Sequence, residues 1–241
     1  MLDFYGATDK GVKRIENQDS FYVAKKAPYV FIVCDGMGGH AAGNVASSSA
    51  AESVYKYVSM HSSFDMTDQK AELLLGGAME YANNIVHSRS LLSSKYAGMG
   101  TTADVCFLNV DTLYISHVGD SRVYLMREGE LIRLTEDHTL VNKLLREGEI
   151  TEKQAEKHPD RHMLTQALGT EEKIEYDFIK QQICEGDIIL MCTDGLTNMV
   201  SEDTIKVLLI SGSAEQAVNQ LIEKANKNGG ADNVTAVVIK F

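Results

Sequence analysis

Short runs of apolar residues recur along the chain, and each one ends at glycine, aspartate or another turn residue. Runs of this kind that are rich in β-branched and aromatic residues predict β-strands; they cover residues 29–34, 102–108, 113–118, 123–126, 188–192 and 234–239. Another apolar run, 131–134, follows the polar tetrapeptide at 127–130, which predicts a hairpin turn.

Longer segments carry apolar residues three to four positions apart, which predicts amphipathic helices. The clearest are residues 43–58, 68–91 and 139–146. Two more segments follow a serine, a residue type that caps helix N-termini. Ser201 precedes the predicted helix at 202–210, and Ser213 precedes the one at 214–226.

The order of these elements indicates the fold class. Helices gather between groups of strands and do not alternate with them one for one, which favours α+β architecture with antiparallel sheets covered by helix pairs. No low-complexity tract or change of composition divides the 241 residues, and only two prolines occur. We therefore expect a single domain over residues 1–241.

Composition and charge exclude several classes of function. The net charge is −11 and no basic stripe is present, which argues against nucleic-acid binding and against docking on anionic membranes. The four cysteines form no Cys-x-x-Cys pair, so neither a zinc ribbon nor a thioredoxin motif is indicated. Cys34 and Cys192 lie inside apolar runs and are expected to be buried thiols of a reducing compartment. No signal peptide or membrane span is evident, which predicts a cytoplasmic protein.

Aspartates fall at the ends of several apolar runs, namely at Asp35, Asp120, Asp194 and Asp232. Each one alone is most simply a turn residue. If they converge, carboxylates about 4 Å apart repel by roughly 4 kcal/mol per pair at an effective dielectric near 20, so such a cluster requires protons or cations. Oxygen ligands without histidine or cysteine point to Mg²⁺ or Mn²⁺ and not to zinc. The spacing alone leaves open whether they converge.

Seven ordered blocks resemble the motifs of the PPM family, the type 2C protein phosphatases, in its small stand-alone bacterial form. The blocks are RIENQD (14–19), DGMGGH (35–40) with Gly43, GMGTT (98–102), HVGDSR (117–122), LTQALG (164–169), TDGL (193–196) and DNVT (232–235). They span nearly the whole chain, with Thr193 standing where serine is commoner. The resemblance implies a four-layer α-β-β-α sandwich, in which two packed, mainly antiparallel sheets are flanked by helix pairs.

The same resemblance implies a metal centre. Asp35 would bridge two Mn²⁺ or Mg²⁺ ions, the Gly36 carbonyl would bind the first ion, and Asp194 and Asp232 would hold the second. Asp120, together with Asp194, would hold a third and weaker ion. For Asp120 the alternative is that it caps the following turn.

Other residues acquire roles around that centre. Asp19 would orient water beside the ions, Arg14 would bind the substrate phosphate, and His40 is the candidate general acid. The alternative for Arg14 is a surface salt bridge with Glu16 or Asp19, and for His40 a polar loop position that shapes the metal shell.

The implied activity is hydrolysis of phosphoserine and phosphothreonine by water activated at the metal centre, without a phosphoenzyme. Its substrates would be phosphorylated proteins, including a membrane Ser/Thr kinase that the enzyme opposes. The alternatives are a same-fold phosphatase for a small molecule or another phosphorylated regulator, and a catalytically silent metal-sensing module. We expect a monomer. His138, His158 and His162 are expected in a flap at about 140–162 that influences substrate choice and holds no catalytic residue.

Overall fold

Two antiparallel β-sheets form the centre of the computed structural model, which describes residues 2–39, 42–63 and 66–241. The first sheet contains, in spatial order, β1 (Asp3–Asp9), β11 (Val234–Lys240), β10 (Ile188–Cys192), β7 (Arg122–Arg127) and β8 (Glu130–Arg133). The second contains β2 (Asp19–Val23), β3 (Tyr29–Met37), β5 (Ala103–Asn109), β6 (Thr112–Val118) and β9 (Asp177–Gln182), with β4 (Gly100–Thr101) paired to β3.

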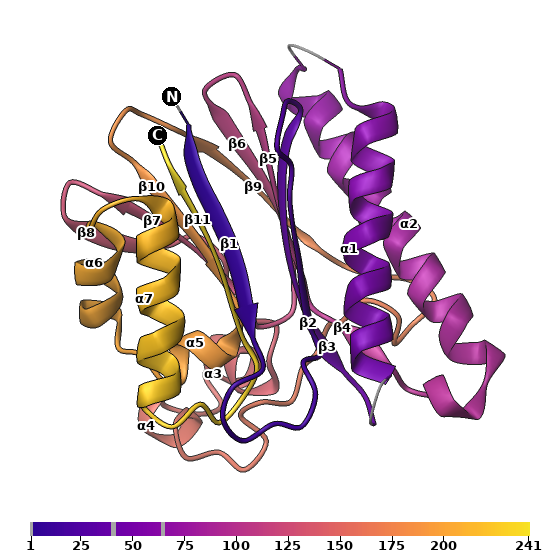
Figure 1. Cartoon of the computed structure of the whole chain (residues 1–241). Helices are drawn as coiled ribbons and strands as arrows, with labels where there is room; N and C mark the ends of the chain where they lie inside the picture. The colour runs from indigo at the N-terminus through magenta and orange to yellow at the C-terminus, as the bar shows by residue number, and fades with distance from the viewer. Residues whose placement is uncertain (1, 40–41, 64–65) are drawn as a thin grey trace.

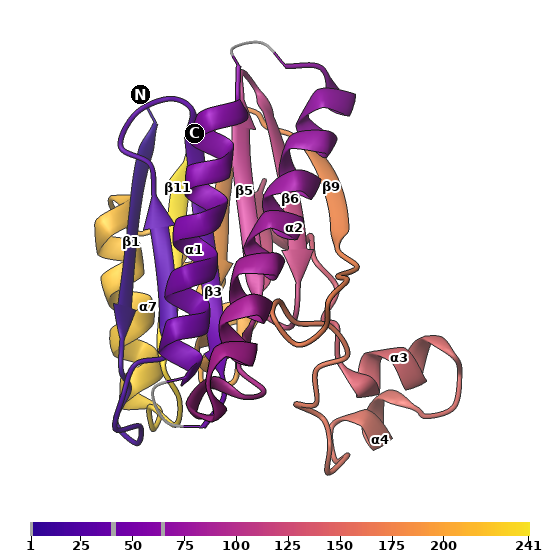
Figure 2. The same ribbon diagram turned by 90° about the vertical axis from the view of Figure 1, so that its right-hand side faces the viewer.

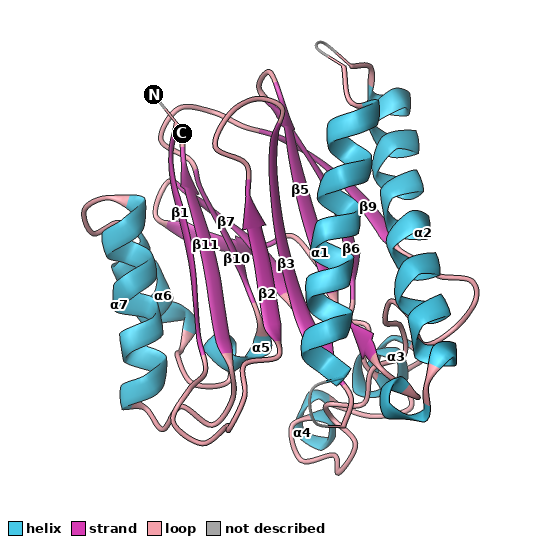
Figure 3. Ribbon diagram, turned by 45° about the vertical axis from the view of Figure 1, so that its right-hand side comes forward, coloured by secondary structure: helices cyan, strands magenta, loops and turns pink. Residues whose placement is uncertain are grey.

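Helices cover the outer face of each sheet, which completes four layers (Figures 1 and 3). The second sheet is covered by α1 (Ala42–His61) and α2 (Asp68–Leu92), and the first by α6 (Glu202–Leu209) and α7 (Ala214–Lys227). The remaining helices are short: η1 (Ser94–Tyr96), α3 (Leu140–Arg146), α4 (Glu152–Ala155) and α5 (Asp194–Thr197). The predicted α-β-β-α sandwich is therefore confirmed.

The central strands are apolar throughout because both of their faces are buried. In β3, Ile32 packs toward the helices while Phe31 and Val33 pack between the sheets. In β10, Leu190 packs toward α6 and α7, and Ile189 packs between the sheets. Successive side chains of a strand point to opposite faces, so a continuous apolar run is what a doubly covered strand requires.

Most predicted elements are present, and the exceptions have local causes. Glu128 and Gly129 have φ of 51° and 85°, the positive values of a tight hairpin turn, so the turn between β7 and β8 is confirmed. Ser213 caps α7 with Gln216 in a capping box. Ser201 occupies the N-cap position of α6, but its hydroxyl pairs with that of Thr204 and not with a backbone N–H.

The predicted strand at 102–108 is wrong at its start, because the strand pairing is interrupted at Thr102. The Thr102 backbone N–H donates to the carbonyl of Asp35, and its hydroxyl accepts from the Asp35 N–H. The periodicity also missed β1, β2 and β9, which lie at or near sheet edges and are largely half-buried.

The segment that carries α3 and α4 projects beyond one end of the sandwich (Figure 2). It leaves the sandwich after β8 and returns before β9. It includes the range predicted as a flap, whose movement stays a prediction. None of the helices in the described parts of the chain has both the length and the apolar character needed to cross a membrane.

Asn83 of α2 fixes the chain where this segment rejoins the sandwich. Its side-chain amide donates to the carbonyls of Glu171 and Glu172 at 3.0 and 3.1 Å, and its Oδ1 accepts from the Gly169 N–H at 2.7 Å. Because Asn83 is only 1% exposed, the Gly169 N–H has no access to water in its place.

We expect Asn83→Ala to lower the free energy of unfolding by about 2–4 kcal/mol, because three hydrogen bonds are lost and a buried N–H is left unsatisfied. Urea denaturation with and without the substitution measures this change. Asn84→Ala, at the exposed neighbouring position of the same helix, is the matched control and should change stability by less than about 0.5 kcal/mol. Equal effects of the two substitutions would contradict this role of Asn83.

Candidate metal centre

Four of the predicted aspartates meet at one end of the two sheets. Asp35 lies in β3, Asp194 begins α5 two residues after the end of β10, Asp232 precedes β11, and Asp120 lies in the turn between β6 and β7. Since β10 and β11 are antiparallel neighbours, the end of one and the start of the other lie at the same edge. The β6–β7 turn crosses from one sheet to the other. All four, with Gly36, line one hollow of about 520 Å³.

Asp19 lies beside these four aspartates, and one of its two carboxylate oxygens is fixed by hydrogen bonds. It pairs in register with Asp35 across β2 and β3. Its Oδ2 accepts hydrogen bonds from the hydroxyls of Thr193 and Thr235 at 2.9 and 2.6 Å. Its Oδ1 is buried and has no hydrogen-bond partner among the residues that the structure describes. A buried carboxylate oxygen left in this way indicates a missing proton, water or cation.

The carboxylates raise one another's pKa. Burial first, and then the charges of Asp194 and Asp232, raise the pKa of Asp19 to about 7 against the hydrogen bonds from the two threonines. Burial and the charges of Asp194 and Asp137 raise the pKa of Asp120 to about 7. The pKa of Asp35 lies well above its ordinary value because of burial and then the neighbouring aspartates. Burial and Asp232 likewise raise the pKa of Asp194.

This donor set fits hard divalent cations. The ligand atoms are oxygens of like charge, and a cation would relieve both their repulsion and the unpaired Asp19 Oδ1. Within the described ranges, no group of three or more acidic, histidine or cysteine side chains lies close enough together to hold a metal ion as it stands. Mg²⁺ keeps several waters as ligands and needs only one or two carboxylates, so an open arrangement remains compatible with it.

Glycine is required at position 36 for a steric reason that the sequence did not reveal. A Cβ on Gly36 would lie 2.1 Å from the carbonyl oxygen of Gly43 and 2.5 Å from that of Gln18. Real Cβ contacts are not this short, so any side chain would push α1 and the chain before β2 away from β3. Position 36 thus fixes how closely β3 approaches α1.

Side chains for which the sequence predicted no function hold the loops around the aspartates by hydrogen bonds. The Asn233 amide donates to the carbonyls of Lys10 and Glu16, both at 2.9 Å, and its Oδ1 accepts from the Gln18 N–H at 2.8 Å. It thereby joins the loop that carries Arg14 to the start of β11. Sequence reasoning missed this function of Asn233, although the residue belongs to the DNVT motif at 232–235.

Thr102 and Thr235 were missed in the same way. Thr102 binds both the backbone of Asp35 and, at 2.8 Å, the hydroxyl of Ser121 beside Asp120. Thr235 binds Asp19 and, at 2.7 Å, the hydroxyl of Thr8. Their hydroxyls connect the aspartates to both sheets.

Arg14 lies at the rim of the hollow and does not pair with Glu16 or Asp19. Its Nη2 lies 2.6 Å from Oδ2 of Asp232, and half of its side chain is exposed. His162 also lines the hollow, and its charge favours the ionised form of Asp194, which opposes the raised pKa of that carboxyl. His40, the candidate general acid, lies outside the described residues.

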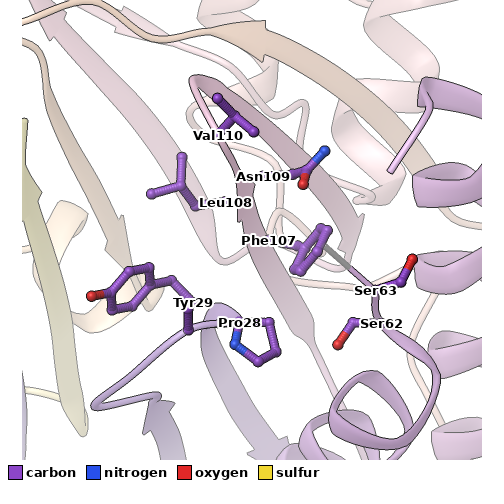
Figure 4. Close-up of a pocket in the computed structure, with 9 residues that line it drawn as sticks. Pro28, Tyr29, Ser62, Ser63, Phe107, Leu108, Asn109 and Val110 are labelled. Carbon is purple, nitrogen blue, oxygen red and sulfur yellow. The ribbon is translucent and has the colours of Figure 1, made fainter. Parts of the chain in front are cut away.

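A second hollow, of about 400 Å³, lies at the other end of α1 and differs in chemistry (Figure 4). It is lined by the β2–β3 turn near Pro28, the end of α1 near Ser62 and the β5–β6 turn near Phe107. No acid, histidine, lysine or arginine is among the described residues that line it. This second hollow therefore lacks the carboxylates that line the hollow around Asp35.

The raised pKa values predict how stability depends on pH when metal is removed. For Asp19 and Asp120, the folded state binds protons up to about pH 7, whereas the ordinary value is 3.8. The folded state therefore loses stability as pH rises between these values. We expect the free energy of unfolding in chelator to fall by about 2 kcal/mol or more from pH 5 to pH 7.5, since each tenfold change in proton affinity corresponds to about 1.4 kcal/mol.

Chemical denaturation at the two pH values measures this loss, and Mn²⁺ should reverse it at pH 7.5. Asp120→Asn separates the aspartate contribution from that of titrating histidines and should give a flatter profile. A rise in stability from pH 5 to pH 7.5 in chelator would show that the carboxylates do not repel as described.

Comparison with known proteins places this geometry in a family. A family model described as Protein phosphatase 2C matches residues 10–144. The chain is similar to protein phosphatase PhpP of Streptococcus pneumoniae, with 36% identity over 237 residues, covering 97% of this chain and 95% of PhpP.

Solved structures agree with this likeness. The S. agalactiae serine/threonine phosphatase has a TM-score of 0.91 at 33% identity and covers 100% of this chain and 99% of that one. The catalytic domain of serine threonine protein phosphatase PstP, in complex with two manganese ions, has a TM-score of 0.86 at 33% identity, covering 99% and 97%. Sequence and fold therefore agree that the chain belongs to the protein phosphatase 2C family.

Proposed function

We propose that this enzyme hydrolyses phosphoserine and phosphothreonine in phosphorylated proteins at a centre of two Mn²⁺ or Mg²⁺ ions. The observation that carries the proposal is one hollow that combines four aspartates with an arginine at its rim. The carboxylates need cations, and the arginine offers a fork matched to phosphate oxygens. The names of the similar proteins, which are serine/threonine phosphatases, support the substrate class.

The ions would be held by Asp35, Gly36, Asp194 and Asp232. The two carboxylate oxygens of Asp35 allow it to serve both ions, and the adjacent strands β10 and β11 bring Asp194 and Asp232 to the same edge. Asp120, with Asp194, would hold a third and weaker ion. When bound, such cations act as Lewis acids that activate water and offset the charge developing on the phosphate.

Asp19 is suited to orient water beside the ions. Two threonine hydroxyls fix its Oδ2, so that Oδ1 is held in place and can accept a hydrogen bond from such a water. His40 is proposed to protonate the serine or threonine oxygen as it leaves, although its side chain lies outside the described residues.

Arg14 would bind the substrate phosphate. Its guanidinium already lies against Asp232 and stays half exposed, so it can contact a phosphate that enters from solvent. Segment 140–162 would act as a flap beside this entrance, because His162 lines the hollow. We further propose a cytoplasmic monomer whose substrates include a membrane Ser/Thr kinase.

Removing one metal ligand tests the metal-dependent mechanism. We expect Asp194→Asn to lower kcat on a phosphothreonine peptide by at least about 100-fold at saturating Mn²⁺, because the charge that holds the second ion is lost. The wild-type enzyme should lose its activity in chelator and regain it with Mn²⁺. Turnover that survives either the chelator or the substitution would overturn the proposal.

Removing the guanidinium tests substrate binding. We expect Arg14→Ala to reduce kcat/KM for a phosphothreonine peptide by about 10- to 100-fold, since a charged hydrogen-bonded contact is worth about 1.5–3 kcal/mol. Arg14→Lys should recover part of the loss because it keeps the charge but not the fork. Lys13→Ala is the matched control at the exposed neighbouring cation, and a loss equal to that of Arg14→Ala would point to general charge attraction.

A further inference from the structure

His138 occupies a junction between the turn that carries Asp120 and the segment beside the metal centre. Its backbone N–H donates to the carbonyl of Gly119 at 2.7 Å, and its Nδ1 accepts from the Gly119 N–H at 3.3 Å. Gly119 directly precedes Asp120 and has φ of 108°, a conformation that L side chains rarely adopt. Both peptide groups of this unusual residue are thus bound by His138, which lies outside segment 140–162 although it was expected within the flap.

The same residue holds the returning end of the segment. Its carbonyl accepts from the Thr165 N–H at 2.8 Å, and the next residue, Thr139, forms an isolated β-bridge with Leu164. Leu164 and His162 line the metal hollow. A displacement of this end of the segment therefore acts on His138, and through it on Gly119.

A half-exposed carboxylate and a buried histidine contact the ring of His138. Its Nε2 lies 3.2 Å from Oδ2 of Asp177, and its ring lies 4.7 Å from that of His117. His117 is fully buried, with Nδ1 2.5 Å from Asp104 and Nε2 2.8 Å from the Glu136 carbonyl. Asp104 and Asp177 lie opposite His117 on the two neighbouring strands.

The charge states of the two rings are complementary. Burial lowers the pKa of His117, but Asp104 outweighs this effect and raises it. Both ring nitrogens of His117 face acceptors, the Asp104 carboxylate and the Glu136 carbonyl, which is the arrangement that a protonated ring satisfies. Burial and the neighbouring His117 charge lower the pKa of His138. A neutral His138 has one acceptor nitrogen and one donor nitrogen. The acceptor is used for the Gly119 N–H, and the donor for Asp177.

We propose that His138 is a positioning residue that sets the Asp120 turn for its cation and links it to segment 140–162. The inference rests on the proposed function, because that proposal makes Asp120 a ligand of the most weakly bound ion. Residues that orient metal ligands without touching the metal commonly change metal affinity by about 10- to 100-fold. His138 acts one step further away, through the backbone of Gly119, so we expect an effect near the lower end of that range.

Two substitutions distinguish the contribution of Nδ1, which contacts Gly119, from that of Nε2, which contacts Asp177. His138→Asn places a carbonyl oxygen near the position of Nδ1 and can still accept from Gly119. His138→Gln places its amide near the position of Nε2, keeps a donor for Asp177 and loses the acceptor for Gly119. Calorimetric titration with Mn²⁺ alone measures the affinity of each class of ion, and the Mn²⁺ dependence of phosphopeptide hydrolysis gives an independent readout.

We expect His138→Gln to weaken the weakest Mn²⁺ site about tenfold, with the tighter ions unchanged, and His138→Asn to stay within about twofold of wild type. Asp177→Ala, at a half-exposed position that does not endanger folding, should weaken the same site by a smaller factor because it frees the ring. Asp120→Ala identifies that site, since it should abolish it.

The outcomes distinguish this inference from the proposed function. A wild-type protein that binds no Mn²⁺ or hydrolyses no phosphopeptide refutes the proposed function itself. If the wild type does both and Asp120→Ala loses the weakest ion, wild-type affinity in both His138→Gln and Asp177→Ala refutes only the role of His138. Equal weakening of every ion by His138→Gln and His138→Asn also refutes it, because that result indicates a structural role.

Discussion

Repulsion among aspartates at one end of two packed sheets is the constraint on which the rest of this structure depends. The pKa values of Asp19, Asp35, Asp120 and Asp194 are all raised, and each carboxyl is affected by its neighbours. A flexible loop would separate such charges. Here they lie at the ends of strands whose two faces are buried, so the apolar layers keep together groups that would otherwise move apart.

Neutral hydrogen-bonding groups hold the centre more than countercharges do. Threonine hydroxyls bind Asp19, Thr102 binds the backbone of Asp35, and the Asn233 amide joins three backbone groups of the N-terminal loop. Because these groups carry no net charge, they fix the carboxylates without neutralising them. The negative charge of the hollow is thereby kept for cations. At the rim, the cationic side chain of Arg14 contacts Asp232.

Sequence patterns predicted the parts of the fold in which burial decides the residue type. The interior strands and the long helices follow from apolar periodicity, and the Glu128-Gly129 turn follows from local backbone preference. The edge strands β1, β2 and β9 were missed because half-buried positions tolerate polar residues. The interruption at Thr102 depends on hydrogen bonds to a residue 67 positions away, which no local pattern encodes.

The site was predictable to the same degree. Aspartates at strand ends suggested a cation site, and the ordered motif blocks supplied the expected ligands, but only the three-dimensional arrangement brings them to one hollow. The roles of Asn233, Thr235 and His138 could not be inferred, because each depends on partners from distant segments. For Gly36, the family resemblance implied a carbonyl that binds an ion, and the structure adds a close contact with Gly43 of α1.

The pairing of β1 with β11 has a consequence for how the protein is made. Among the described strands, β1 has β11 as its sheet partner, and β11 begins two residues after Asp232. Chains fold progressively as the ribosome extends them, and contacts between distant segments wait for the later one. Strand β1 therefore stays unpaired until β11 has been synthesised, and a nascent chain that lacks β11 also lacks an assembled centre. Topology alone thus withholds phosphatase activity from a chain that has not yet reached β11.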